Sequence, residues 1–109
     1  MSEEQNGSEI EVFQTNRFEK QLNKLSEAQR EVVEDEIDNI IDDPELGKRK
    51  KGDLSHLWVH KFKLDKQEVL LGYSWVEDKL ELYLLNIGPH ENYYDSMKKS
   101  RKADLKLIG

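Results

Sequence analysis

The sequence predicts an α+β fold, in which a short strand and a helical hairpin precede a three-stranded antiparallel meander. Two observations lead to this prediction. Apolar residues recur at helical spacing between residues 15 and 43, whereas from residue 56 they alternate with polar residues or form short runs. The segments 65–68 and 77–79 that join these runs are short and polar. We therefore expect the two helices to cover one face of an antiparallel sheet.

The first strand and the first helix are indicated by "EIEVFQTNRFEKQLNKL". Residues 9–14 alternate polar and apolar, which is typical of a short strand. The apolar face of the helix that follows consists of Phe18, Leu22 and Leu25. Asn16 and Glu19 stand at the spacing of a capping box and predict where this helix begins.

A second helix is predicted to begin at Ser26, because Gln29 stands at capping-box spacing from it. Its buried face is formed by Val33, Ile37, Ile40 and Ile41, and its exposed face is acidic. Pro44 disfavours helical geometry at Asp43, so the helix ends there. The short joint between the two helices predicts an antiparallel hairpin.

The meander follows a loop, residues 44–55, with four consecutive cations. The first strand, residues 56–64, places His56, Trp58, His60, Phe62 and Leu64 on one face and Leu57, Val59, Lys61 and Lys63 on the other. "VLLGYSWV" (69–76) is apolar on both faces and is predicted to be the central strand, and "LELYLLNI" (80–87) is the last. The polar residues that follow predict a short helix that frays into a tail.

The 109 residues are expected to form one domain, residues 9–100, between a disordered tail (1–8) and a basic C-terminal tail (101–109). The chain has no cysteine, no apolar secretory segment and no apolar run of the ~20 residues that span a bilayer. We therefore expect a cytoplasmic protein without membrane contact. The net charge is −6, but residues 1–47 carry −10 and residues 48–109 carry +4. The basic part is suited to a polyanion, or else these charges only keep the domain soluble.

Three pieces of the chain, within residues 10–99, have the order and spacing of one known family. They are "FEKQLNKL", "DPELGKRKKGDLSHLWVHKFK" and "LLNIGPHENYYDSMKK". On these pieces the chain resembles the RelE/ParE superfamily of toxins from bacterial and archaeal type II toxin–antitoxin systems. The resemblance implies the RelE-like β-α-α-β-β-β(-α) fold, no cofactor, and a cognate antitoxin as partner in a hetero-oligomer.

Many RelE-like toxins are mRNA interferases, which cut mRNA in the ribosomal A site without a metal and so inhibit translation. In this reaction the ribose 2′-OH attacks the adjacent phosphate, which requires a base, an acid and cations. By position, the resemblance assigns these roles to Lys61, Lys63, His90 and Tyr94, with Tyr93 as the second choice. The residues expected to bind RNA are Lys48, Arg49, Lys50, Lys51 and His60.

Each of these assignments has a structural alternative. A histidine, with an unperturbed pKa of ~6.5, exchanges protons near neutral pH, so His90 is the expected acid or base. Alternatively, His90 or Asn92 begins the last helix and one tyrosine packs on the sheet. Lys61 and Lys63 point the same way, ~7 Å apart, and either bind neighbouring phosphates or form a solvated strand surface.

Two features favour a different function. Val69 and Leu70 stand where relatives carry an arginine, and the acidic net charge is unusual for a protein that docks on ribosomal RNA. The second hypothesis is therefore a non-catalytic toxin-fold protein that binds DNA gyrase, as ParE-like members do, or only its antitoxin. No metal site is expected, because His56 and His60 would stand ~13 Å apart along a strand.

Overall fold

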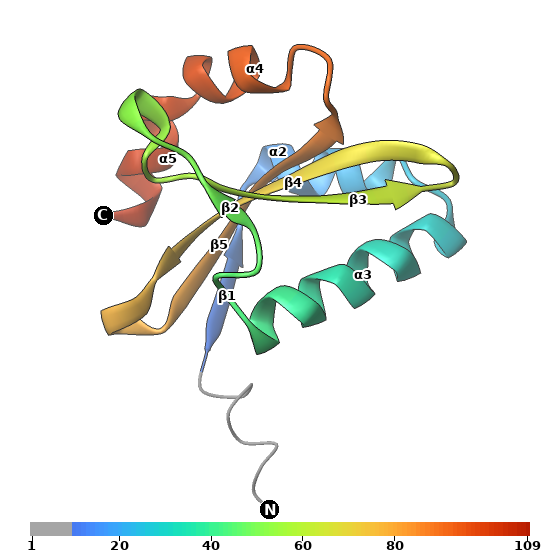
Figure 1. Ribbon diagram of the computed structural model, residues 1–109, viewed down its shortest axis with the longest axis horizontal. Coiled ribbons are helices and arrows are strands. Elements are labelled where there is room, and N and C mark those ends of the chain that lie inside the picture. The colour runs from blue at the N-terminus through green and yellow to red at the C-terminus, as the bar shows by residue number, and fades with distance from the viewer. Residues whose placement is uncertain (1–9) are drawn as a thin grey trace, which may run out of the picture.

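A computed structural model describes residues 10–109 and shows an α+β fold, with helices packed on both faces of one sheet (Figure 1). The strands are β1 (Glu11–Gln14), β2 (Lys48–Arg49), β3 (Trp58–Leu64), β4 (Gln67–Val76) and β5 (Glu81–Pro89). The helices are α2 (Asn16–Asn23), α3 (Glu27–Asp42), α4 (Tyr93–Lys99) and α5 (Arg101–Ile108). Two short 3₁₀ turns are η1 (Gly52–Leu54) and η2 (Glu77–Lys79). The predicted fold class is confirmed.

The sheet has the strand order β1-β5-β4-β3-β2. Strands β3, β4 and β5 form the predicted antiparallel meander, and β4 lies at its centre. The β3–β4 connection is tight, because Asp65 and Lys66 both adopt left-handed backbone angles that reverse the chain. Strand β1 pairs with β5 in parallel, so the sheet is mixed rather than purely antiparallel. The strand β2 was predicted to be part of a loop; it pairs with β3 through only two residues.

Hydrogen bonds at the helix starts confirm one predicted cap and correct the other. The Ser26–Gln29 capping box is present: each side chain accepts a hydrogen bond from the other residue's backbone N–H, at 3.1 and 3.0 Å. The Asn16–Glu19 box is wrong, because Asn16 is already the first helical residue. The cap is Thr15, whose extended backbone lets its hydroxyl accept from the Phe18 N–H at 2.9 Å.

The sheet separates two apolar clusters. The larger lies under the α2–α3 hairpin and is built on Phe18, Val33, Ile40, Leu71, Tyr73 and Leu82. The smaller lies on the opposite face, under α4, and is built on Leu57, Val59, Leu70, Leu85, Tyr93 and Met97. The predicted alternation along β3 is confirmed, since Trp58 and Phe62 pack toward the hairpin and Val59 packs toward α4. The face under α4 is the one that carries the candidate site.

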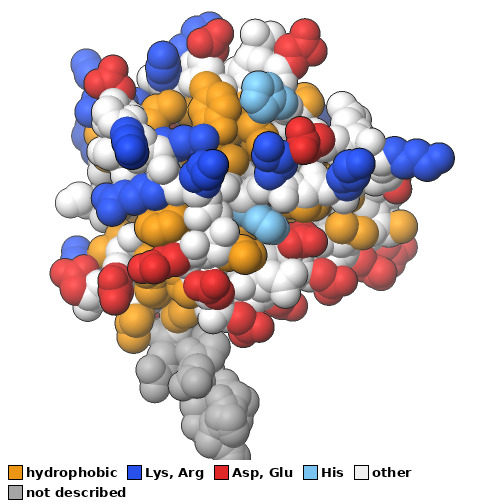
Figure 2. Space-filling model, in the orientation of Figure 1, with side chains coloured by type: hydrophobic (Ala, Val, Ile, Leu, Met, Phe, Trp, Pro, Cys, Tyr) orange, Lys and Arg blue, Asp and Glu red, His pale blue; other side chains and the backbone are white. Residues whose placement is uncertain are grey.

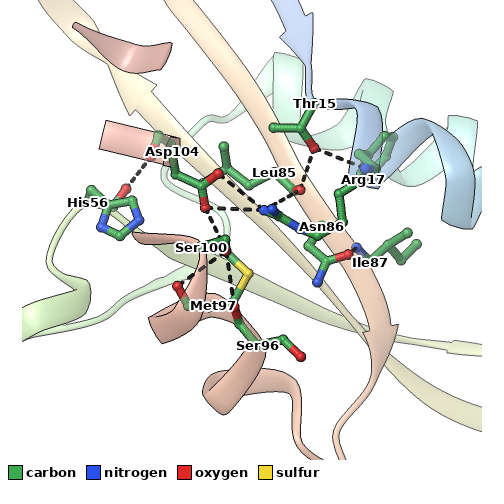
Figure 3. Close-up of polar contacts among 12 residues, drawn as sticks. Thr15, Arg17, His56, Leu85, Asn86, Ile87, Ser96, Met97, Ser100 and Asp104 are labelled. Atoms are coloured by element: carbon green, nitrogen blue, oxygen red, sulfur yellow. Dashed lines mark hydrogen bonds and ion pairs between the residues drawn. The ribbon is translucent and has the colours of Figure 1, made fainter. Parts of the chain in front are cut away.

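Residues 101–108, predicted to be a tail, instead form helix α5. Asp104 of α5 is 2% exposed, and its carboxylate accepts hydrogen bonds from Arg17 Nη2 at 3.2 Å (Figure 3). The same Arg17 nitrogen donates to the Leu85 carbonyl of β5 at 3.0 Å. These contacts join the start of α2 to a helix 87 residues later, which no local pattern could show. The predicted tail 1–8 lies outside the described residues. Within residues 10–109, no helix combines the length and apolarity needed to cross a membrane.

Candidate functional site

A cavity of about 460 Å³ opens beside β2 and β3, below the loop that leads into α4. Its polar wall consists of Lys48, Lys50, His60, Lys61, His90 and Tyr94, and its apolar wall of Leu46, Gly47, Val59 and Leu70. On the face shown in Figure 2, lysine and arginine side chains form a band across the molecule, with histidines beside it and acidic side chains below. The fold therefore brings most of the predicted site residues to one basic hollow.

The rings of His90 and Tyr94 meet at the upper wall of this cavity. They form an edge-to-face pair with centroids 5.9 Å apart. Lys50 Nζ lies over the Tyr94 ring, 5.0 Å from its centroid, in a cation–π contact. A proton-exchanging imidazole, a phenol and an ammonium thus converge, although Lys50 and His90 come from segments 40 residues apart in the chain. Such a set can move a proton and hold a phosphate.

Tyr93 occupies a different environment from its neighbour Tyr94. Its side chain is 3% exposed, and its hydroxyl donates a hydrogen bond to the Asn86 carbonyl at 3.0 Å. Burial raises the pKa of Tyr93 well above the usual value, so its phenol keeps its proton and supplies neither an acid nor an ionised base near neutral pH. The hydroxyl lies against Gly72, where a Cβ would collide with it. The structural alternative for this loop is therefore met: Asn92 is the N-cap residue of α4, without a side-chain capping bond, and Tyr93 packs on the sheet. His90 remains exposed.

The two strand lysines differ in position. Lys61 lines the cavity, and its Nζ lies 4.0 Å from Glu68 Oε2 in an exposed pair. Lys63 follows on the same strand face but does not line the cavity, nor do Arg49 and Lys51. The Arg49 Nε instead donates to the Ser55 carbonyl at 3.1 Å.

His60 reaches the cavity from the opposite face of β3. Its Nε2 lies 2.7 Å from Glu36 Oε1 on α3, and its ring stacks on Phe62 with centroids 5.5 Å apart. This contact with Glu36 was not predicted, because Glu36 was one of many acidic residues on the helix. His60 is thus held in place by a carboxylate.

The central strand supplies no charge to the cavity. Leu70 lines its floor, and Val69 packs on the other face, under the hairpin. His56 lies away from the cavity, and burial lowers its pKa. Residues 10–109 contain no cluster of three histidine, aspartate or glutamate residues arranged to hold a metal. The cavity's cations therefore come from the β2 segment and from β3.

Comparison with known proteins places these features in context. A family model described as ParE-like toxin of type II bacterial toxin–antitoxin system matches residues 12–98. Among curated proteins, the search found no match. Among solved structures, a mutant of the E. coli toxin RelE in the free state, in which two arginines are replaced by alanine, is similar to this chain. The match has a TM-score of 0.67 and 15% identity, over 85% of this chain and 96% of that one.

Two complexes also contain similar chains. In the E. coli RelBE toxin–antitoxin complex the match has a TM-score of 0.61 and 20% identity, over 75% of this chain and 98% of that one. In the archaeal RelE–RelB complex from Pyrococcus horikoshii the match has a TM-score of 0.55 and 17% identity, over 76% of this chain and 97% of that one. At these identities the structural likeness concerns the fold.

Proposed function

The chain belongs to the ParE-like toxin family of type II bacterial toxin–antitoxin systems, and we propose that it acts as a metal-independent endoribonuclease that cuts ribosome-bound mRNA. The observation that carries this proposal is the cavity in which His90, Tyr94 and three lysines converge. These are the kinds of group that cleavage by a ribose 2′-OH requires.

In the proposed reaction, the 2′-oxygen forms a bond to phosphorus while the bond from phosphorus to the 5′-oxygen breaks. The 2′-OH loses its proton to a base, and the leaving 5′-oxygen gains one from an acid. His90 is the proton-exchanging group and Tyr94 its partner, while Lys50 and Lys61 stabilise the charge that develops on the phosphate. The products are a 2′,3′-cyclic phosphate and a 5′-hydroxyl end.

His90→Ala tests this assignment. We expect cleavage of mRNA on purified ribosomes to fall by about 10²-fold, the scale of a lost general acid or base. Stability should be unchanged, because the His90 side chain is exposed. Glu91→Ala is the matched control, since Glu91 is also exposed but does not line the cavity. A His90→Ala protein that cleaves at the wild-type rate would exclude His90 from the chemistry.

The absence of a cation from the central strand favours a second candidate function. Leu70 makes the cavity floor apolar where the resemblance implies an arginine, and a binding role does not require a complete catalytic set. Inhibition of DNA gyrase, the target of ParE-like members, is the test of this second function. Inhibition of DNA supercoiling by the wild-type protein, without new mRNA ends in cells, would favour this function over the ribonuclease.

The proposed partner is a cognate antitoxin. The E. coli and P. horikoshii relatives were crystallised as RelE–RelB toxin–antitoxin complexes. In this chain, the band of cations around the cavity suits an acidic or amphipathic segment that covers it. Co-purification of a co-expressed neighbouring reading frame tests this, and an on-rate that does not change with salt would contradict the electrostatic part.

A further inference from the structure

The segment that carries Lys48 and Lys50 into the cavity is tied to the sheet by few backbone contacts. Strand β2 pairs with β3 only through Lys48 with Val59 and Arg49 with Trp58. One further bond joins the Lys50 N–H to the Leu57 carbonyl at 2.9 Å. Because the central strand gives the cavity no cation and β3 gives it only Lys61, two of its three lysines depend on how this segment is placed.

A buried hydroxyl holds the turn just before this segment. Tyr73 of β4 is fully buried, and its Oη donates to the Pro44 carbonyl at 2.7 Å and accepts from the Gly47 N–H at 2.9 Å. Both partners belong to the turn 44–47 that connects α3 to β2. The Tyr73 ring is itself fixed by stacking on Trp58, with centroids 6.3 Å apart.

Gly47 fits closely against this hydroxyl. A Cβ at Gly47 would stand 2.9 Å from Tyr73 Oη and 2.8 Å from the Val59 carbonyl oxygen. The turn is therefore held from inside by the hydroxyl and can approach it only without a side chain. A tyrosine that merely filled the core would not need its two hydrogen bonds to meet the two ends of one turn.

We propose that Tyr73 is a positioning residue: its hydroxyl fixes the turn 44–47 so that Lys48 and Lys50 lie at the cavity and meet RNA phosphates. This inference rests on the proposed ribonuclease function, and it adds a residue on the far face of the sheet that does not line the cavity. Tyr73 acts through the turn and does not touch the substrate.

Tyr73→Phe removes the hydroxyl and keeps the ring, and Tyr83→Phe is the matched control. Tyr83 is also buried, on the neighbouring strand, but its hydroxyl donates to Glu81 at 2.9 Å, outside the cavity. In Tyr73→Phe we expect trypsin to cut after residues 48–51 about tenfold faster, because two hydrogen bonds that hold the turn are lost. Tyr83→Phe should be cut there at the wild-type rate.

The second measurement is the affinity for a single-stranded RNA oligonucleotide over a range of salt concentrations. Each lost phosphate contact lowers the slope of log affinity against log salt by about 0.7. Tyr73→Phe should therefore bind more weakly, with a slope reduced by about 1.4 if both lysines lose their contacts. A general loss of stability would not change this slope. Gly47→Ala, which displaces the turn and keeps the hydroxyl, should show the same two effects.

The outcomes separate this inference from the function on which it rests. A wild-type protein that binds no RNA and cleaves no mRNA on purified ribosomes refutes the ribonuclease proposal and the positioning role with it. A wild-type protein that binds RNA, beside a Tyr73→Phe variant with the same salt slope, refutes the positioning role alone. Tryptic cleavage of Tyr73→Phe at the wild-type rate also refutes it, because the turn would then not depend on the hydroxyl.

Discussion

The adjacent residues Tyr93 and Tyr94 are expected to respond in opposite ways to the same substitution. Tyr93→Phe removes a buried hydroxyl and leaves the Asn86 carbonyl without this donor. Tyr94→Phe removes a hydroxyl at the wall of the cavity, where the side chain is half-buried and water can replace it. The first change should therefore affect stability and the second should affect the reaction.

The structure sets the size of each effect. Loss of the hydrogen bond from Tyr93, which is 3% exposed, should lower the free energy of unfolding by about 1–2 kcal/mol. With a urea dependence of about 1–1.5 kcal/mol per molar for a domain of this size, the midpoint falls by about 1 M. Tyr94→Phe should change stability by less than about 0.5 kcal/mol and lower RNA cleavage by about 10²-fold.

Urea unfolding followed by circular dichroism, and single-turnover cleavage of ribosome-bound mRNA, measure the two effects on the same samples. Cleavage by Tyr93→Phe should stay within about threefold of wild type at low urea, where the variant is folded. The reasoning is refuted if Tyr93→Phe loses cleavage at unchanged stability. It is refuted equally if Tyr94→Phe unfolds at lower urea and cleaves normally.

Three further predictions concern stability, pH and charge. Arg17→Met leaves the buried Asp104 carboxylate without its cation and should lower the free energy of unfolding, measured in urea, by about 2–3 kcal/mol. This is less than the loss expected for a fully buried pair, because Arg17 is 30% exposed. A decrease of less than about 0.5 kcal/mol would contradict this. Burial raises the pKa of Tyr73 to about 12, so the unfolded chain loses this proton first. Stability should therefore fall by roughly 2 kcal/mol as pH rises from about 10 to 12, and fall less in Tyr73→Phe. Lys61→Ala should weaken RNA cleavage more than Lys63→Ala, because only Lys61 lines the cavity, and equal effects would argue against the cavity as the site.

Much of the fold was predictable because it depends on local patterns. The Ser26–Gln29 cap and the apolar face with Val33 and Ile40 define α3 from neighbouring residues alone. Alternation along β3 determined which side chains face the hairpin, since successive strand residues point to opposite faces. The same alternation placed Lys61 on the face that carries His90 and Tyr94.

Residues near a helix or strand end were harder to predict. Thr15 and Asn16 are both good caps, and only the extended backbone at Thr15 decides between them. Tyr93 and Tyr94 are adjacent residues of the same type, and no local pattern distinguishes them. At the start of α4, however, the Tyr93 ring packs on the sheet and the Tyr94 ring lines the cavity. A rotation of one residue along a helix decides which tyrosine is available for chemistry.

The sequence by itself determined the order of the main elements other than β2 and α5, the faces of the strands and the family pieces, because each depends on residues close together in the chain. Only the tertiary structure decided that β1 pairs in parallel with β5, that Asp104 meets Arg17, and that Lys50 lies over the Tyr94 ring. These contacts join residues 40 to 90 positions apart, and their energy comes from burial and charge that exist only once the chain has folded. The cavity is the product of such contacts, which is why its residues were individually visible in the sequence but its shape was not.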